Sequence, residues 1–147
     1  MASKERDNMK ALWMVLASLG LAACASTGAG SAEGNRSLAG SWRLTEVAAQ
    51  NVPMTGGSAK LLQFDAGTNK VSGNVGCNRL FGVYQSEGER LSFNGIATTR
   101  MACDPISMQM ETNVVQNMEK VQTWSINGSE LQLKDQAGQT ILKFKRL

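Results

Sequence analysis

The sequence predicts a small α+β domain in which a strongly bent antiparallel sheet, or a partial barrel, packs on a single helix. Short segments that alternate apolar and polar residues, separated by turn residues, fill most of residues 38–147. One segment among them carries helix signals instead, and strands on both sides of a single helix are typical of the α+β class. The whole chain has 147 residues, which leaves room for one hydrophobic core.

The first half of this domain is expected to be all strand. Each expected strand is short and is bounded by glycine, asparagine, aspartate or serine, the residues that favour turns. The expected strands are residues 41–47, 60–65, 70–75, 82–85 and 90–93.

One helix should follow, with Asp104 as its N-cap and Pro105 at its first position. Four apolar residues then recur at four-residue spacing, which predicts a stripe that packs on the sheet. They are Ile106, Met110, Val114 and Met118. Methionine fills irregular spaces well, so Met108 is also expected to serve the core rather than a metal site.

Two strands after the helix are expected to form a hairpin. Residues 123–126 and 129–133 flank Asn127-Gly128, a pair that favours a type I′ turn and that would set Trp124 opposite Leu131, both facing the core. A last strand, 140–145, follows a turn at 135–138. Its alternating lysines favour an exposed or edge position.

The N-terminal residues resemble an export signal rather than part of the fold. Lys10 precedes the apolar run 11–17, which is shorter than the roughly 20 residues that a transmembrane helix needs. Residues 1–8 are unusually polar for such a signal, so Met9 competes with Met1 as the natural start. We therefore expect residues 1–23 to be a signal peptide.

The segment Leu21-Ala22-Ala23-Cys24 resembles the bacterial lipobox, in which the cysteine is lipidated before cleavage. Two or three acyl chains would anchor the protein stably to a membrane. The next residue is Ala25 rather than aspartate, which by resemblance indicates the outer membrane, with the domain facing the periplasm. Residues 24–37 then form the lipidated cysteine and a Gly/Ser/Thr-rich tether, and about 14 such residues reach roughly 20 Å.

Composition argues against several classes of function. The net charge of +3 is small and spread along the chain, so a nucleic-acid partner is not expected. The chain has no histidine, which removes the commonest general base and metal ligand. We expect no metal, no cofactor and no enzymatic turnover, because no Ser-Lys or carboxylate arrangement stands out in the spacing either.

Several segments resemble the META/HslJ family. They are 73–84 (GNVGCNRLFGVY), 98–103 (TTRMAC), the helix with Glu111 and the hairpin after it, and the early segment 40–44 (GSWRL). Together they span nearly the whole domain in the family's order. The resemblance implies a non-enzymatic envelope domain, associated in bacteria with heat shock and novobiocin resistance, without an established substrate.

Within these segments, two interpretations of the polar residues stay open. Gly73, Gly76 and Gly82 would permit bends or close strand approach, with Asn78 bonded to its own turn; alternatively the loop faces a ligand. The charged residues of the segments are Arg79, Arg100 and Glu111. They form either a surface or half-buried ion-pair set or, with Asn78, a binding site.

Cys77 and Cys103 have three possible roles. They could be a catalytic pair or metal ligands, but they are not in a C-x-x-C arrangement and no other soft ligand accompanies them. Lipidation would use Cys24 and leave these two thiols in an oxidising compartment. A structural disulfide is therefore the favoured interpretation.

Three functions follow from these observations. The first is an envelope accessory protein, anchored in the membrane, that binds an unidentified envelope component. The second is a lipoprotein that binds a small apolar ligand or inhibits a hydrolase, which requires an open pocket between sheet and helix, lined by Trp42, Phe64, Phe81 and Trp124. An enzyme is the third and has the least support.

Overall fold

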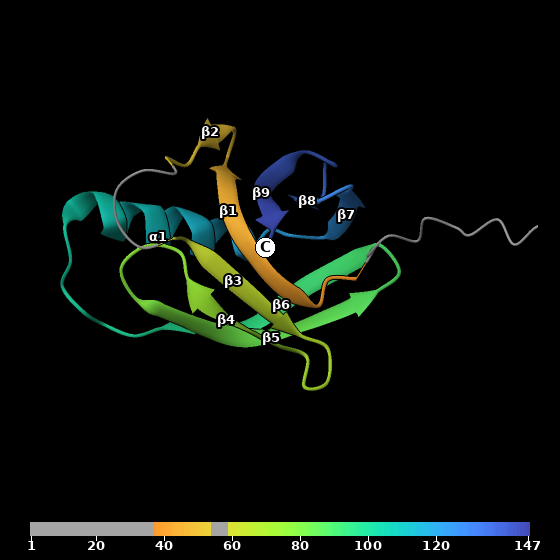
Figure 1. Ribbon diagram of the computed structural model, residues 1–147, viewed down its shortest axis with the longest axis horizontal. Helices are drawn as coiled ribbons and strands as arrows, with labels where there is room; N and C mark the ends of the chain where they lie inside the picture. Colours follow the sequence, from red (N-terminus) through yellow and green to blue (C-terminus); the bar gives the residue numbers. More distant parts are fainter. Residues whose placement is uncertain (1–36, 54–58) are drawn as a thin grey trace, which may run out of the picture. The chain divides into compact units, whose positions relative to one another are not determined.

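The computed structural model describes residues 37–53 and 59–147; the expected signal peptide, Cys24 and most of the expected tether lie outside these residues. Within the described residues, nine strands and one helix follow in chain order (Figure 1). The strands before the helix are β1 (Gly40–Val47), β2 (Gln50–Asn51), β3 (Leu61–Asp65), β4 (Lys70–Asn74), β5 (Arg79–Glu87) and β6 (Arg90–Thr98). The helix α1 (Pro105–Met118) precedes β7 (Thr123–Asn127), β8 (Glu130–Lys134) and β9 (Thr140–Arg146). The expected α+β class is confirmed, with the sheet dominating.

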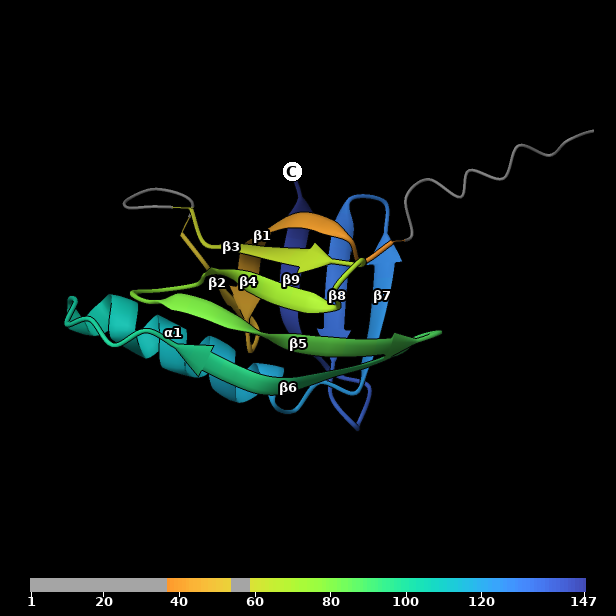
Figure 2. The same ribbon diagram turned by 90° about the horizontal axis from the view of Figure 1, so that it is seen from below.

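The strands form a ring. Their order in the sheet is β2-β1-β3-β4-β5-β6-β7-β8-β9, and an additional antiparallel pairing joins β1 to β9. Figure 2 shows β8 and β9 behind β3 and β4. The ring is a bent antiparallel sheet and not a closed barrel, because β6 and β7 share a single residue pair, Arg90 with Thr123. The short strand β2, which the sequence did not predict, pairs only at the end of β1.

Of the two positions expected for the last strand, exposed or at an edge, the edge position is wrong. β9 lies between β8 and β1, so both of its edges are paired. Its lysines are accommodated on the outer side of the ring, where Lys143 Nζ lies 2.9 Å from Glu46 Oε2 on β1. A local alternation of charge and apolar residues indicates which side of a strand faces solvent, but it does not reveal whether the strand's edges are paired.

The inner side of the ring holds one hydrophobic core. Alternate residues of β1 point inward, and the fully buried Trp42 donates its indole N–H to the carbonyl of Leu38 at 2.8 Å. The guanidinium carbon of Arg146 lies 4.1 Å from the centre of the Trp42 ring, a cation–π contact. Further core residues are Leu44, Leu62, Phe64, Val71, Leu80, Leu91, Leu131, Leu133, Leu142 and Phe144.

The hairpin of β7 and β8 forms with a different turn from the one expected. Asn127 pairs with Glu130, so the two-residue loop is Gly128-Ser129, and Gly128 has a φ of 59°. A glycine at the first central position is typical of a type II′ turn. Trp124 consequently lies opposite Leu133 instead of Leu131. Since this shift is two residues, the side chains keep their face; Leu131 is fully buried and Trp124 is half-buried at the core's margin.

The helix begins as expected, because the Asp104 side chain accepts a hydrogen bond from the Ser107 amide at 2.9 Å. Its buried residues are Glu111, Val114 and Met118, and the last two belong to the core cluster. The expected stripe is wrong at its start, since Ile106 is 80% exposed. Met108 is exposed too and is not core filler. The reason is the position of the first turn, which extends beyond the strands (Figure 2).

Candidate functional site

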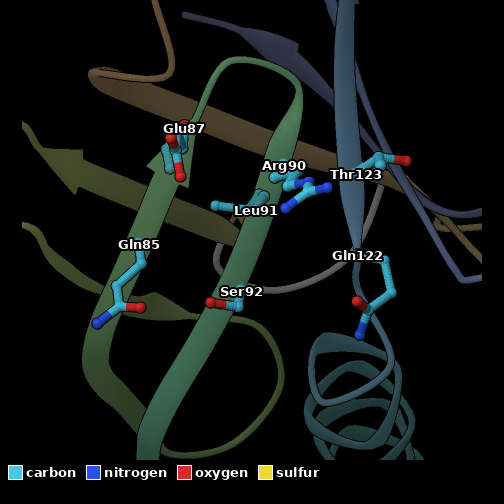
Figure 3. Close-up of a pocket in the computed structure, with 8 residues that line it drawn as sticks. Gln85, Glu87, Arg90, Leu91, Ser92, Gln122 and Thr123 are labelled. Carbon is cyan, nitrogen blue, oxygen red and sulfur yellow. The ribbon is translucent and has the colours of Figure 1, made fainter.

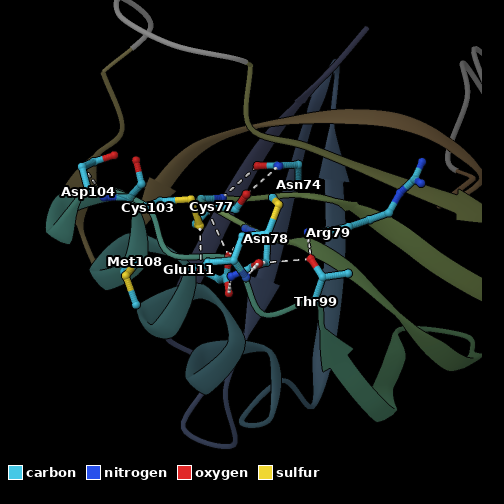
Figure 4. Close-up of a disulfide and its surroundings, with 12 residues drawn as sticks. Asn74, Cys77, Asn78, Arg79, Thr99, Cys103, Asp104, Met108 and Glu111 are labelled. Carbon is cyan, nitrogen blue, oxygen red and sulfur yellow. Dashed lines mark hydrogen bonds between the residues drawn. A yellow bond between two sulfur atoms is a disulfide. The ribbon is translucent and has the colours of Figure 1, made fainter.

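The candidate site lies where the glycine-rich loop between β4 and β5 meets the start of α1 (Figure 4). Gly76 lets the loop approach the helix, because a Cβ there would lie 2.5 Å from the carbonyl oxygen of Ser107. Gly73 lets β4 approach β3, because its Cβ would lie 2.0 Å from the carbonyl oxygen of Leu61. Contacts this short do not occur in folded proteins, so the expected role of close approach is confirmed.

Cys77 and Cys103 form a disulfide that ties this loop to the residue before the helix cap. Their Cα atoms are 5.8 Å apart, inside the usual range for a disulfide. The bridge confirms the favoured interpretation of the pair. Within residues 37–53 and 59–147, no group of three or more side chains is arranged to hold a metal ion.

The carboxylate of Glu111 points from the helix into the same loop. It accepts hydrogen bonds from the backbone amides of Cys77, at 3.1 Å, and of Asn78, and from the Asn78 side-chain amide at 3.0 Å. Only 9% of the residue is exposed. Three N–H donors are the partners that a buried carboxylate requires. In the part of the chain that the structure describes, Glu111 has no ion pair with Arg79 or Arg100, so the interpretation as an ion-pair set is wrong.

Asn78 is the centre of the network, rather than a residue bonded only to its own turn. Its side-chain oxygen accepts from the Met101 amide at 2.6 Å and from the Thr99 hydroxyl at 3.1 Å. The Thr99 oxygen accepts in turn from the Arg79 amide at 3.0 Å. Asn78 therefore joins the loop, the helix and the segment after β6, as the dashed bonds of Figure 4 show in part.

The local role expected of Asn78 belongs to Asn74, a residue that the sequence interpretation passed over. Its side-chain oxygen accepts from the amide of Gly76 at 3.2 Å, and its amide donates to the carbonyl of Cys77 at 3.3 Å. An asparagine two residues before a glycine is a typical signal for this kind of turn. That signal was present in the sequence at Asn74.

The side chains of Arg79 and Arg100 lie outside the network. Both side chains are exposed, and in Figure 4 the Arg79 side chain points away from Glu111. The structure thus brings Asn78 and Glu111 into contact and leaves the two arginines at the surface. The lipidation candidate, Cys24, lies outside the described residues.

The apolar pocket of four aromatic residues that would favour a small-ligand function does not form. Trp42 and Phe64 are buried in the core, whereas Phe81 is 48% exposed on the outer face of β5. A hollow of about 480 Å³ beside Phe81 and a separate one of similar volume beside Trp124 share none of their lining residues. The four rings cannot line one site, because successive side chains of a strand point to opposite faces of the sheet. Trp42 and Phe64 point into the ring, whereas Phe81 points out of it.

A further hollow of about 750 Å³ lies between the β5–β6 hairpin and the start of β7 (Figure 3). Its lining is mainly polar, with Gln85 and Arg90 on the hairpin and Gln122 and Thr123 on the opposite side. Among the residues described, no helix is long and apolar enough to cross a membrane.

Solved structures share this fold. An NMR structure of a protein from Burkholderia xenovorans is 27% identical, with a TM-score of 0.61, and the match covers 74% of this chain and 81% of that one. A crystal structure of a DUF4847 family protein from Bacteroides vulgatus is 12% identical, with a TM-score of 0.53 over 73% of this chain and 92% of that one, and shows likeness of fold alone. No curated protein matches the chain. Residues 36–146 match the family model described as "META domain".

Proposed function

The chain belongs to the META domain family, and from this premise we propose that it is an envelope lipoprotein that acts by stoichiometric binding of another envelope component. In this proposal, residues 1–23 direct export and Cys24 carries the lipid. Residues 24–37 form the tether, and the META domain faces the periplasm from the outer membrane. Its physiological role is resistance to envelope stress, including exposure to lipophilic antibiotics such as novobiocin.

The Cys77–Cys103 disulfide is the observation that carries this proposal. Structural disulfides persist in oxidising compartments such as the periplasm and are rare in the cytosol. The chain has three cysteines, and the bridge uses two of them. The third is Cys24, which is the cysteine that ends the lipobox-like segment.

The hydrogen bonds of Glu111 support a binding function rather than a catalytic one. Glu111 is the only buried carboxylate among the described residues, and its oxygens already accept three N–H bonds. A catalytic acid or base needs a proton acceptor or donor free to reach a substrate. Here the buried charge stabilises the loop and helps to set the surface that the loop presents.

Mass spectrometry of the protein purified from membranes tests the anchor. We expect a mature N-terminus at a lipid-modified Cys24, and we expect a Cys24→Ala chain to lose that modification. An unmodified N-terminus elsewhere in the wild-type protein would refute the lipoprotein assignment. Cys103→Ala is a matched control, because it removes a cysteine without touching the lipobox.

Genetic complementation tests the binding role. A deletion strain should become sensitive to novobiocin, and wild-type protein should restore growth. Arg79→Ala, Arg100→Ala and Glu111→Ala are expected to weaken rescue only in step with lost stability or lost partner capture by crosslinking. A purified domain that hydrolyses an ester, peptide or cell-wall substrate, with turnover abolished by one of these changes at unchanged stability, would overturn the proposal.

A further inference from the structure

The outer face of β5 exposes large apolar side chains that the core does not use. Phe81 is 48% exposed and Val83 is 42% exposed, two residues apart on the same face. Their cross-strand neighbours on β4 are Ser72 and Lys70, and the hollow of about 480 Å³ opens beside them. Isolated exposed apolar residues are ordinary, but neighbouring ones around a hollow are typical of a contact surface.

The segment after β6 adds a third apolar side chain and fixes its backbone. Met101 is 58% exposed, while its amide donates to Asn78 and the disulfide at Cys103 secures the chain two residues later. The amide of Thr99 also donates to the Arg79 carbonyl at 3.0 Å, so this segment runs beside the start of β5. A surface already fixed in this way loses little conformational entropy when it binds.

Basic side chains border these apolar residues. Arg79 precedes Phe81 by two residues on the same face, Lys70 lies opposite Val83, and Arg100 adjoins Met101. The acidic residue on this part of the face is Asp65 on β3, and Lys70 is its cross-strand neighbour on β4. We define the β5 face as Lys70, Arg79, Phe81, Val83, Arg100 and Met101; its combination of apolar and basic side chains is typical of proteins that lie on anionic membranes.

We propose that the β5 face docks on the anionic headgroup surface of the bilayer, with Phe81, Val83 and Met101 in the interface and the basic residues beside lipid phosphates. A second copy of the chain fits this face less well. An isologous contact would bring two copies of the same basic patch together, and like charges repel. The inference deepens the proposed function, because it assigns a surface to the membrane side of the anchored domain.

The proposed anchor makes a weak surface contact sufficient. Twelve residues separate Cys24 from Ser37, where the described chain begins. A Gly/Ser-rich linker of that length has a root-mean-square reach of roughly 20 Å, so docking becomes an intramolecular event in the proposed lipoprotein. Docked and undocked domains can then interchange, and the β5 face sets the orientation in which the rest of the surface meets envelope partners.

Vesicle binding by the full chain with Cys24→Ala tests the face without the lipid anchor. The probe is a vesicle of phosphatidylethanolamine and phosphatidylglycerol in equal parts, compared with one of phosphatidylcholine. We expect Arg79→Gln with Arg100→Gln to weaken binding to the anionic vesicle by about tenfold or more, since each basic residue near an anionic surface contributes measurably. Phe81→Ser should weaken it as well.

Matched controls show whether vesicle binding depends on the β5 face or only on the net charge of the protein. Lys120→Gln with Lys145→Gln removes the same charge from exposed positions elsewhere, and Leu147→Ser removes an apolar side chain that is 60% exposed. Both should leave binding unchanged. The N-terminal apolar run is identical in every variant, so differences between variants exclude its contribution. Circular dichroism melts verify that each variant is folded.

Three results would overturn the proposal. The first is that the control variant, Lys120→Gln with Lys145→Gln, loses as much vesicle binding as the variant of the β5 face. The second is that Arg79→Gln with Arg100→Gln binds the anionic vesicle as well as wild type does. The third is that the protein does not bind the vesicle but sediments as a dimer, which Phe81→Ser converts to a monomer. The vesicle experiment tests the docking inference independently of whether Cys24 is lipidated. If Cys24 proves unmodified in cells, the vesicle result still stands; if vesicle binding fails while Cys24 is lipidated, only the docking inference is lost.

Discussion

Replacing Glu111 with glutamine should destabilise the domain far more than its small change in size implies. The carboxylate accepts three N–H bonds, two of them at the backbone of Cys77 and Asn78. Glutamine keeps one acceptor oxygen and puts an NH₂ donor where the other oxygen lay. At least one buried donor would then face another donor, and the charge that strengthens the remaining bonds would be gone.

The number of hydrogen bonds at Glu111 determines how much unfolding free energy the substitution should remove. Hydrogen bonds to a charged group contribute about 1.5–3 kcal/mol each, so three of them represent roughly 4.5–9 kcal/mol before any rearrangement. Such a loss would equal most of the stability of a typical domain, which is about 5–15 kcal/mol. Glutamine retains part of the network, and the 9% exposure of the site admits some water. We therefore expect the free energy of unfolding to fall by about 2–4 kcal/mol.

Guanidinium denaturation with the disulfide intact measures this change. Glu119→Gln is the matched control, because Glu119 lies at the end of the same helix and is exposed. It should shift the free energy of unfolding by less than about 0.5 kcal/mol. If the two variants lost the same amount, the hydrogen bonds at Glu111 would not stabilise the fold as argued.

Three further predictions address separate parts of the structure. Gly73→Ala should lower the thermal midpoint sharply, because its Cβ would lie 2.0 Å from a carbonyl oxygen on β3, and an unchanged midpoint would contradict that packing. Replacing Cys77 and Cys103 together with alanine should cost about 3.5 kcal/mol of unfolding free energy in the chain-entropy model, and denaturation curves without any difference would exclude it. Hydrogen bonds from Ser107 hold the pKa of Asp104 below 3.8, so its contribution to stability is present above that pH and is lost as the pH falls through the lowered pKa. Asp104→Asn, which keeps a capping oxygen, should therefore lose less stability than wild type over that pH range in acid denaturation.

Local signals predicted the elements well. The helix begins at Pro105 because Asp104 can cap it, and both facts depend on neighbours in the sequence. The strands from β3 onward start within three residues of their expected positions, since alternation and turn residues are also local. The hairpin shows the limit, because the Asn-Gly pair and the Gly-Ser pair compete for the same turn and only the full β7–β8 ladder decides between them.

Non-local pairing accounts for most of what the sequence did not reveal. The β1–β9 ladder joins segments about a hundred residues apart, and nothing within β9 alone indicates a partner on each side. Asn78 likewise bonds to Thr99, Met101 and Glu111, which all lie more than twenty residues away. The resemblance to the META family indicated which polar residues were candidates for a site, but not which of them would be in contact. Glu111 and Asn78 do meet, whereas Arg79 and Arg100 stay at the surface.

The pairing of the first and last strands also constrains when the domain can fold. β9 comprises seven residues near the end of the chain, and without it β1 and β8 each present a free edge. Arg146, which belongs to the same strand, holds the segment before β1 through hydrogen bonds to the carbonyls of Ser37 and Ala39. The ring therefore stays open until β9 has paired with both β1 and β8. Until β9 has joined, the unpaired edges of β1 and β8 are open to pairing with other chains, so closing the ring also removes two sites of edge-to-edge aggregation.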